Sequence, residues 1–192
     1  MMTNSLISVA LSTIGQDKPG LVSALTEALT AVAGNIADST MTRLGGQFAM
    51  ILLLEFPTEA AWLQFQQALL GLEEKLGLVF THKRLAQVIL PAHLVAQNPA
   101  EKPHRSYLVS VAGRDKTGIT FEVSKLLAGF EANITDLNAH SISGEEGMVY
   151  ILVVEFDCPK TVPHETLDAE LQALGTRLSL EVRLRSVDAI AL

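Results

Sequence analysis

The sequence has little that would place it in a membrane, in an oxidising compartment or on nucleic acid. Among 192 residues there is one cysteine, Cys158, which excludes an internal disulfide and is typical of a reducing compartment. No apolar run approaches the ~18 residues that cross a bilayer, and the first residues lack the basic stretch of a signal peptide. The net charge of −7 repels nucleic acid and anionic lipid. We therefore expect a cytoplasmic protein with no membrane partner and no direct nucleic-acid partner.

Patterns that carry catalysis or bind metals are also scarce. No histidine motif accompanies Cys158, so its thiol is predicted to be inert and to lie at the surface or half-buried. The five histidines show no metal-ligand spacing. Aromatic residues make up 5% of the chain, too few to predict base stacking on a sheet, and no helix-turn-helix remains once the elements are assigned. We expect no catalytic residue, no metal and no cofactor, and therefore no enzyme.

What the sequence does contain is one pattern written twice. The stretch "GQDKPG" at 15–20 closes an apolar run and opens a helical one, and "GRDKTG" at 113–118 does the same at an offset of 98. Asn35-Ile36 then matches Asn133-Ile134 at the same offset. Two extra residues, 145–146, shift the offset to 100 on this interpretation, because "EF" at 55–56 then meets "EF" at 155–156. Matches in this order indicate an internal duplication.

Each half predicts the element order β-α-β-β-α-β. In the first half, alternation over 7–11 predicts a strand, and a helical face follows over 21–32. Paired glycines within 44–47 predict a hairpin turn, Pro57-Thr58 begins a second helix, and a last strand lies near 78–88. The second half repeats this order. In its last strand, alternation places Glu181, Arg183 and Arg185 on one face of the sheet, which is therefore partly wet.

This order predicts an α+β protein of two ferredoxin-like domains. Each is expected to be a four-stranded antiparallel sheet with two helices on one face. The domains are predicted at 1–89 and 106–192, and the proline-containing stretch 90–105 is predicted to be the linker.

The repeated loop has the glycines of a phosphate cradle without its chemistry. A Walker loop needs Lys and Ser or Thr directly after its second glycine, whereas Leu21-Val22 and Ile119-Thr120 stand there. Neither copy gives the dinucleotide fingerprint G-x-G-x-x-G. Two interpretations remain open. The loop is a tight strand-to-helix turn, or it is a helix N-terminus that binds a small carboxylate.

Several residues of the loop have an expected role. Asp17 and Asp115 are predicted to be N-caps, and Pro19 to preset the helical φ of the first turn. Gly20 and Gly118 are predicted to leave space for a ligand or a neighbouring backbone.

The asparagine after each first helix has two interpretations that the sequence leaves open. Asn35 and Asn133 can hydrogen-bond the amine or carboxylate of a ligand. They can equally occupy a left-handed turn after the helix.

Together these residues resemble the ACT domain. Both halves have the D-[KR]-x-G turn, the helix, and then G-N-I or A-N-I with an aspartate two residues further on. The resemblance implies βαββαβ regulatory modules that bind amino acids. A tandem pair without a catalytic or DNA-binding domain resembles the glycine cleavage system transcriptional repressor family. This implies a non-enzymatic amino-acid sensor, with glycine the suspected ligand, that acts through a DNA-binding transcription regulator and is compatible with a homodimer.

The alternative is an adaptor module that mediates assembly and binds no metabolite. By resemblance, the ACT ligand site falls on Gly15, Asp17, Lys18, Pro19, Gly20, Asn35 and Ile36, and again on Gly113, Asp115, Lys116, Thr117, Gly118, Asn133 and Ile134. The second copy has Thr117 where the family usually has proline, so the second loop is predicted to be less rigid.

Overall fold

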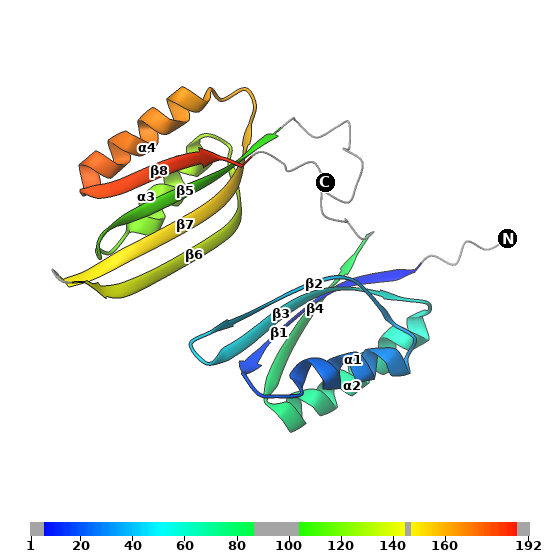
Figure 1. Cartoon of the computed structure of the whole chain (residues 1–192). Coiled ribbons are helices and arrows are strands. Elements are labelled where there is room, and N and C mark those ends of the chain that lie inside the picture. Colours follow the sequence, from blue (N-terminus) through cyan, green and yellow to red (C-terminus); the bar gives the residue numbers. More distant parts are fainter. Residues whose placement is uncertain (1–5, 87–103, 145–146, 188–192) are drawn as a thin grey trace. The chain divides into compact units, whose positions relative to one another are not determined.

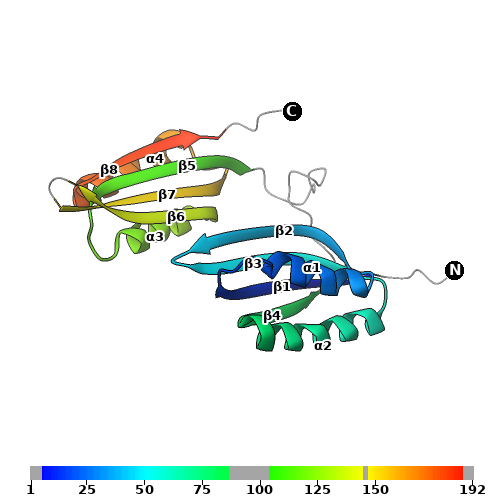
Figure 2. The ribbon, with the colours of Figure 1, turned by 60° about the horizontal axis from the view of Figure 1, so that its bottom comes forward.

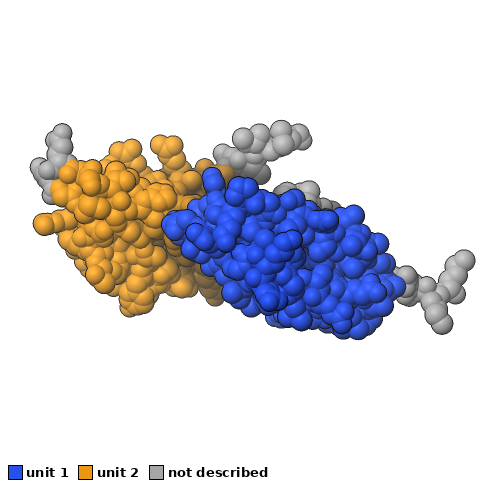
Figure 3. All heavy atoms as spheres, turned by 90° about the horizontal axis from the view of Figure 1, so that it is seen from below, with its two compact units in different colours: residues 1–97 blue, residues 98–192 orange. Residues whose placement is uncertain are grey.

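The chain forms two compact units, residues 1–97 and 98–192 (Figure 3). The computed structural model describes residues 6–86, 104–144 and 147–187. Most of the predicted linker, 90–105, lies outside these residues, so the domain boundaries stay a prediction.

Unit 1 is a four-stranded antiparallel sheet with both helices on one face (Figure 1). The strand order is β2-β3-β1-β4. Its elements are β1 (Ile7–Gln16), α1 (Leu21–Ala31), β2 (Asn35–Leu44), β3 (Gln47–Phe56), α2 (Glu59–Leu76) and β4 (Leu78–Leu85).

Unit 2 repeats the architecture with the order β6-β7-β5-β8. Its elements are β5 (His104–Arg114), α3 (Ile119–Gly129), β6 (Asn133–Gly144), β7 (Gly147–Pro159), α4 (His164–Leu178) and β8 (Leu180–Ser186). The predicted α+β fold of two ferredoxin-like domains is confirmed. No helix among the described residues is long and apolar enough to cross a bilayer.

The core of unit 1 lies between the sheet and the two helices. The predicted face of α1 is confirmed, because Leu21, Leu25 and Leu29 are all buried. In the same core, Trp62 and Phe65 of α2 pack against Phe56 of β3, with ring centroids 5.2 and 5.3 Å from the Phe56 ring. Each such buried side chain contributes about 1.5–3 kcal/mol relative to an exposed one.

The core of unit 2 includes the cysteine. Cys158 is 1% exposed and packs in the same cluster as Tyr107 and Phe156. The prediction of a surface or half-buried thiol is therefore wrong. The reason is that β7 continues to Pro159, so alternation carries Cys158 to the helix side of the sheet, as it carries Phe156 and Val154.

The offset between the matching strands β3 and β7 differs from the predicted value of 100. On the first strand of the hairpin Asp38 corresponds to Asp136, an offset of 98, yet these residues pair with Leu53 and Glu155, an offset of 102. The β6–β7 hairpin is therefore longer by two residues on each strand, and the alignment of the two "EF" pairs is not structural. A shift of two keeps every side chain on its face, so the hydrophobic pattern could not reveal it.

One edge strand of each sheet has an outward backbone group bonded to a helix. In unit 1, α2 lies beside the edge strand β4 (Figure 2), and the Phe80 N–H donates to Oε1 of Glu73 at 3.0 Å. In unit 2, Nε2 of Gln172 donates to the Val182 carbonyl oxygen on β8 at 3.1 Å. These groups are therefore not available to an added strand.

Candidate functional site

The first loop is tied to the turn between β2 and β3. The backbone N–H of Asp17 donates to the carbonyl oxygen of Gly46 at 3.0 Å. Its carboxylate Oδ2 accepts from Nη1 of Arg43 at 3.2 Å. In unit 2 the corresponding Asp115 donates from its N–H to the Met148 carbonyl at 3.0 Å and accepts from the Ser141 hydroxyl at 2.7 Å. The loop is therefore held by the neighbouring hairpin in both units.

The aspartates are not helix caps, contrary to the sequence prediction. The N-cap residues of α1 and α3 are Gly20 and Gly118, and neither helix has a side-chain capping bond. The carboxylates of Asp17 and Asp115 instead accept hydrogen bonds from side chains of β2 and β6. The first-turn N–H groups of both helices consequently have no side-chain acceptor among the described residues, and a helix N-terminus in this state favours an anion.

The second glycine of each loop is required by its backbone conformation. Gly20 has φ +93° and Gly118 has φ +97°, in the left-handed region that glycine adopts without penalty. A Cβ on Gly20 would meet only the Ser23 hydroxyl, at 3.8 Å, and one on Gly118 would meet nothing within 4 Å. No neighbour among the described residues approaches these glycines closely, so the predicted approach of a neighbouring backbone is wrong and the space beside them is open.

Close approach occurs instead at the first glycine. A Cβ on Gly15 would lie 2.8 Å from the Gly77 carbonyl oxygen. A Cβ on Gly113 would lie 2.6 Å from Cδ2 of Leu180 and 3.2 Å from the Ser179 carbonyl oxygen. These glycines let the first strand of each unit pass the end of the second helix.

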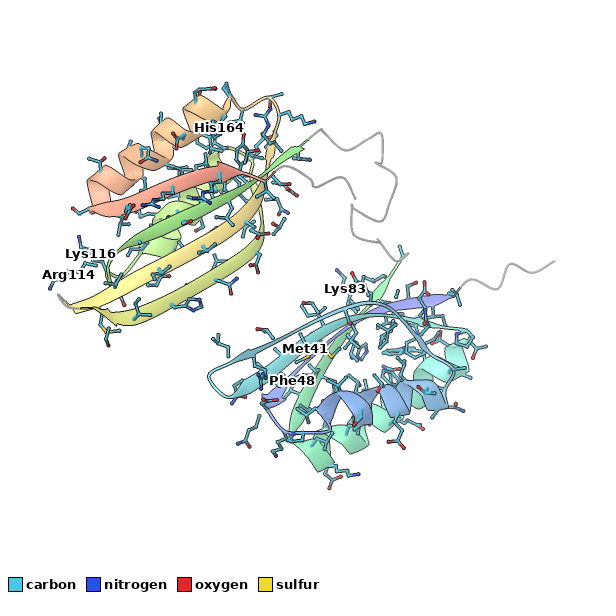
Figure 4. All side chains as sticks on the ribbon, viewed as in Figure 1. Met41, Phe48, Lys83, Arg114, Lys116 and His164 are labelled. Carbon is cyan, nitrogen blue, oxygen red and sulfur yellow. The ribbon has the colours of Figure 1, made fainter. Side chains whose placement is uncertain are left out.

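The two loops differ in their middle residues. Pro19 lies before the N-cap Gly20, outside the first helical turn in which it was predicted. Nζ of Lys116 donates to the Leu178 carbonyl at the end of α4, at 3.2 Å, whereas Lys18 makes no side-chain bond to the described residues. Figure 4 shows Lys116 near the β6–β7 turn and His164 at the opposite end of the unit. The lower rigidity expected from Thr117 stays a prediction.

The electrostatic surroundings of the two helix N-termini also differ. The first turn of α1 has no acidic residue, whereas that of α3 has Glu122. A hydrogen bond from Arg177 at 2.7 Å lowers the pKa of Glu122, so it is a carboxylate at neutral pH. An anion is therefore favoured more at α1.

An open hollow of about 520 Å³ lies beside Asp17 and is lined by residues 41–46.

The predicted asparagine and isoleucine lie at the other end of the sheet. Asn35 pairs with Glu55, which also pairs with Ser8, seven residues before Gly15 on β1. At about 3.3 Å per residue, this places Asn35 about 23 Å along the sheet from the loop. Ile36 packs on the core. One small ligand cannot contact both sets of residues within unit 1.

Unit 2 has the same separation. Asn133 pairs with Asp157, which pairs with Ser106, seven residues before Gly113. Ile134 packs on its core. The left-handed interpretation of the asparagines is wrong, because the positive φ values after the helices belong to Ala33 (54°) and Glu131 (55°).

The sequence reading missed a hollow on the face of the unit 1 sheet that carries no helix. This hollow has a volume of about 300 Å³, and Ser12, Ile14, Ile51, Val79 and Thr81 are among its lining residues. Alternation in β1, β3 and β4 contained the signal, because it predicts that these side chains share one face. Among the described residues, no group of three or more His, Cys, Asp or Glu could hold a metal ion.

The fold agrees with a comparison to known families. The model of the ACT domain matches residues 8–83 and 106–185. The chain belongs to the ACT-domain family. Each match falls within one compact unit, so this is a tandem ACT protein.

Individual relatives match one domain or the whole chain. The UPF0237 protein of Methanocaldococcus jannaschii is 36% identical over 81 residues, which are 42% of this ACT protein and 87% of the relative. The crystal structure of an unknown protein from Galdieria sulphuraria has a TM-score of 0.74 and 23% identity, over 96% of this chain and 100% of that one. A structure provisionally described as a glycine cleavage system transcriptional repressor has a TM-score of 0.69 and 19% identity, over 95% and 98%. The two structures show the shared tandem fold.

Proposed function

We propose that this tandem ACT protein is a non-enzymatic regulator that senses a small amino acid at the loop of unit 1. The observation that supports this is the N-terminus of α1, which a left-handed Gly20 opens without a side-chain cap and without an acidic first turn. The ligand carboxylate would accept hydrogen bonds from the backbone N–H groups of the first turn of α1. The Asp17 carboxylate, already paired with Arg43, would attract the ligand amine.

The ligand proposed is glycine or another small amino acid. A Cβ added to Gly20 would meet only Ser23, so the space beside Gly20 is open. The loop of unit 2, Gly113 to Gly118 with Lys116 and Thr117 between them, is proposed as a weaker site. Lys116 is bonded to α4 and Glu122 lies in the first turn of α3.

The proposed output is control of transcription through a DNA-binding regulator protein in the cytoplasm. The net charge of −7 opposes direct binding to duplex DNA. The fold shared with a provisionally described glycine cleavage repressor supports a role of this kind. A second candidate is an adaptor that binds no metabolite, which the exposed apolar side chains Ile14, Ile51 and Val79 favour.

Ligand-induced stabilisation separates the two candidates. The full chain is unfolded thermally with each of the twenty amino acids, and a ligand at a hundredfold excess over its dissociation constant should stabilise by about 2.7 kcal/mol. Gly20→Leu should lose the shift with glycine or whichever small amino acid gives one. Gly118→Leu is the matched control, because its backbone has nearly the same φ and suffers the same strain.

The outcomes are distinct. A shift lost in Gly20→Leu and largely kept in Gly118→Leu supports the unit 1 site. A shift kept in full by both variants means that sensing occurs elsewhere, and no shift with any amino acid favours the adaptor.

A further inference from the structure

The helix-free face of the unit 1 sheet, which we call the open face, carries rows of side chains. One end of this face carries the row Asn35, Glu55, Ser8 and Leu85, and three further rows follow it. Each row crosses the sheet in the order β2, β3, β1, β4, as the strand registers define. Of these three, the first row is Asp38, Leu53, Ala10 and Lys83; the second is Thr40, Ile51, Ser12 and Thr81; the third is Thr42, Ala49, Ile14 and Val79.

The second and third rows are uncharged, and all their side chains are exposed except Ser12 and Ala49, which are half-buried. Ile51 is 52%, Ile14 51% and Val79 57% exposed, and the hollow of about 300 Å³ lies between these rows. The hydroxyls of Ser12 and Thr81 bond to each other at 2.6 Å. Apolar side chains gathered on one face in this way are typical of a surface that is covered in the assembled protein.

The corresponding face of unit 2 is different. At the positions of Thr81 and Val79 it carries Arg183 and Glu181, which form an ion pair. Arg185 lies beyond them on the same face, as the sequence predicted. The apolar open face is therefore a property of unit 1 and not a requirement of the fold.

We propose that a second copy of this chain covers the open face of unit 1, sheet against sheet, about a twofold axis parallel to the strands. This axis places β2 over the partner's β4 and β3 over the partner's β1. Large side chains then meet small ones in every row. Ile51 lies opposite the partner's Ser12, Ile14 opposite the partner's Ala49, and Leu53 opposite the partner's Ala10. Interdigitation of this kind lets two sheets pack at about 10 Å.

The charges of the first row fit the same operation. Asp38 lies at the β2 end of the row and Lys83 at the β4 end, where Figure 4 shows Lys83. The twofold axis places Asp38 opposite the partner's Lys83, and the pair occurs twice. Covering the open face with the face of unit 2 would instead desolvate Arg183 and Glu181 against apolar rows, which is costly. The charges therefore favour a second copy.

The size of the surface sets the strength of the dimer. Four strands about 4.8 Å apart and three rows about 6.7 Å apart give roughly 400 Å² of flat area per copy, before side-chain relief is added. The total is close to the lower limit of about 1,000 Å² for a specific interface. We therefore expect a reversible dimer with a dissociation constant of order micromolar.

The test is sedimentation of the full chain over a range of concentrations, without any amino acid. Wild type should pass from monomer to dimer, and Ile51→Lys should raise the dissociation constant at least tenfold. The matched control is Leu63→Lys on α2, because Leu63 is 51% exposed and lies on the helix side of unit 1; it should leave the dimer unchanged. The double change Val79→Glu with Thr81→Arg, which copies unit 2, should abolish the dimer while the fold is kept.

A charge exchange tests the orientation. Asp38→Lys and Lys83→Asp should each weaken the dimer, and the double variant should recover it in part, since each new lysine again faces an aspartate. A wild type that stays monomeric at ~200 μM, about a hundredfold above a micromolar constant, overturns the proposal. A dimer that survives Ile51→Lys also overturns it. So does an Ile51→Lys variant that changes the sedimentation of the monomer and leaves the dissociation constant unchanged. A dimer whose charge exchange gives no recovery overturns the twofold axis. Because no ligand is added, these outcomes are independent of amino-acid sensing.

Discussion

Gly15 passes so close to Gly77 that a Cβ added to Gly15 would stand 2.8 Å from the Gly77 carbonyl oxygen. Gly77 itself ends α2 in the left-handed conformation, with φ +68°. The start of the first loop is therefore fixed by the end of the second helix, through backbone atoms that have little freedom to move.

Gly15→Ala should consequently destabilise unit 1 by about 1–3 kcal/mol, the usual cost of overpacking. Gly113→Ala should cost less, because the nearest atom there belongs to the flexible Leu180 side chain and the backbone oxygen is 3.2 Å away. Urea unfolding of the full chain measures both. Gly71→Ala in α2, where a Cβ meets nothing within 4 Å, is the control and should stabilise by about 0.5–1 kcal/mol. Equal costs at Gly15 and Gly71 would contradict the close approach.

Thr13→Val should leave unit 1 as stable or raise its stability by about 1 kcal/mol. Thr13 is 2% exposed and its hydroxyl has no hydrogen-bond partner among the described residues, so valine removes an unpaired polar atom at nearly the same volume. Thr81→Val is the control, because it deletes the bond to Ser12 and should not stabilise. Denaturant midpoints compare the two variants, and a clear loss of stability in Thr13→Val would show that its hydroxyl is bonded.

The stability of unit 2 should fall as the pH rises above about 8.5. Burial raises the pKa of the Cys158 thiol, so the folded state keeps its proton at a pH where an unfolded thiol, with a pKa of about 8.5, loses it. This contribution is complete below the unfolded pKa and is lost as the pH rises through the folded one. Unfolding of wild type and Cys158→Ala between pH 7 and 10 measures it. An identical pH slope in the two proteins would contradict the assignment.

The purified protein should not shift a duplex DNA band at ~150 mM salt, since its net charge of −7 repels the phosphate backbone. A band shift appearing only after a DNA-binding regulator is added agrees with the proposed route. A shift with this protein alone, persisting at that salt concentration, contradicts it.

Burial made the fold predictable. The spacing of Leu21, Leu25 and Leu29 reports one buried helix face, and Gly45 and Gly46, both with positive φ, report a two-residue hairpin turn. These signals are local or periodic, and the second half of the chain repeats them and so supports the same fold prediction.

The site was less predictable because its contacts are distant in the sequence. An aspartate before a helix looks like a cap, but Arg43 lies 26 residues from Asp17 and takes its carboxylate. Gly15 and Gly20 look alike in the sequence. The structure shows that Gly20 is needed for its positive φ, whereas Gly15 is needed because Gly77 lies so close to it. Similarly, the apolar run 48–54 is typical of a buried strand, whereas Ile51 is 52% exposed and belongs to the open face.

The hydrogen bonds that the Phe80 N–H donates to Glu73 and that Gln172 donates to the Val182 carbonyl also bear on how these sheets can grow. A fibril lengthens when each added chain offers the next one a strand edge with unused backbone groups. At β4 and β8 some of these groups already belong to the chain's own helices, so an incoming strand would have to displace them. Growth from those two edges is thereby slowed at its first step, because Glu73 and Gln172 occupy backbone groups that an added strand would need.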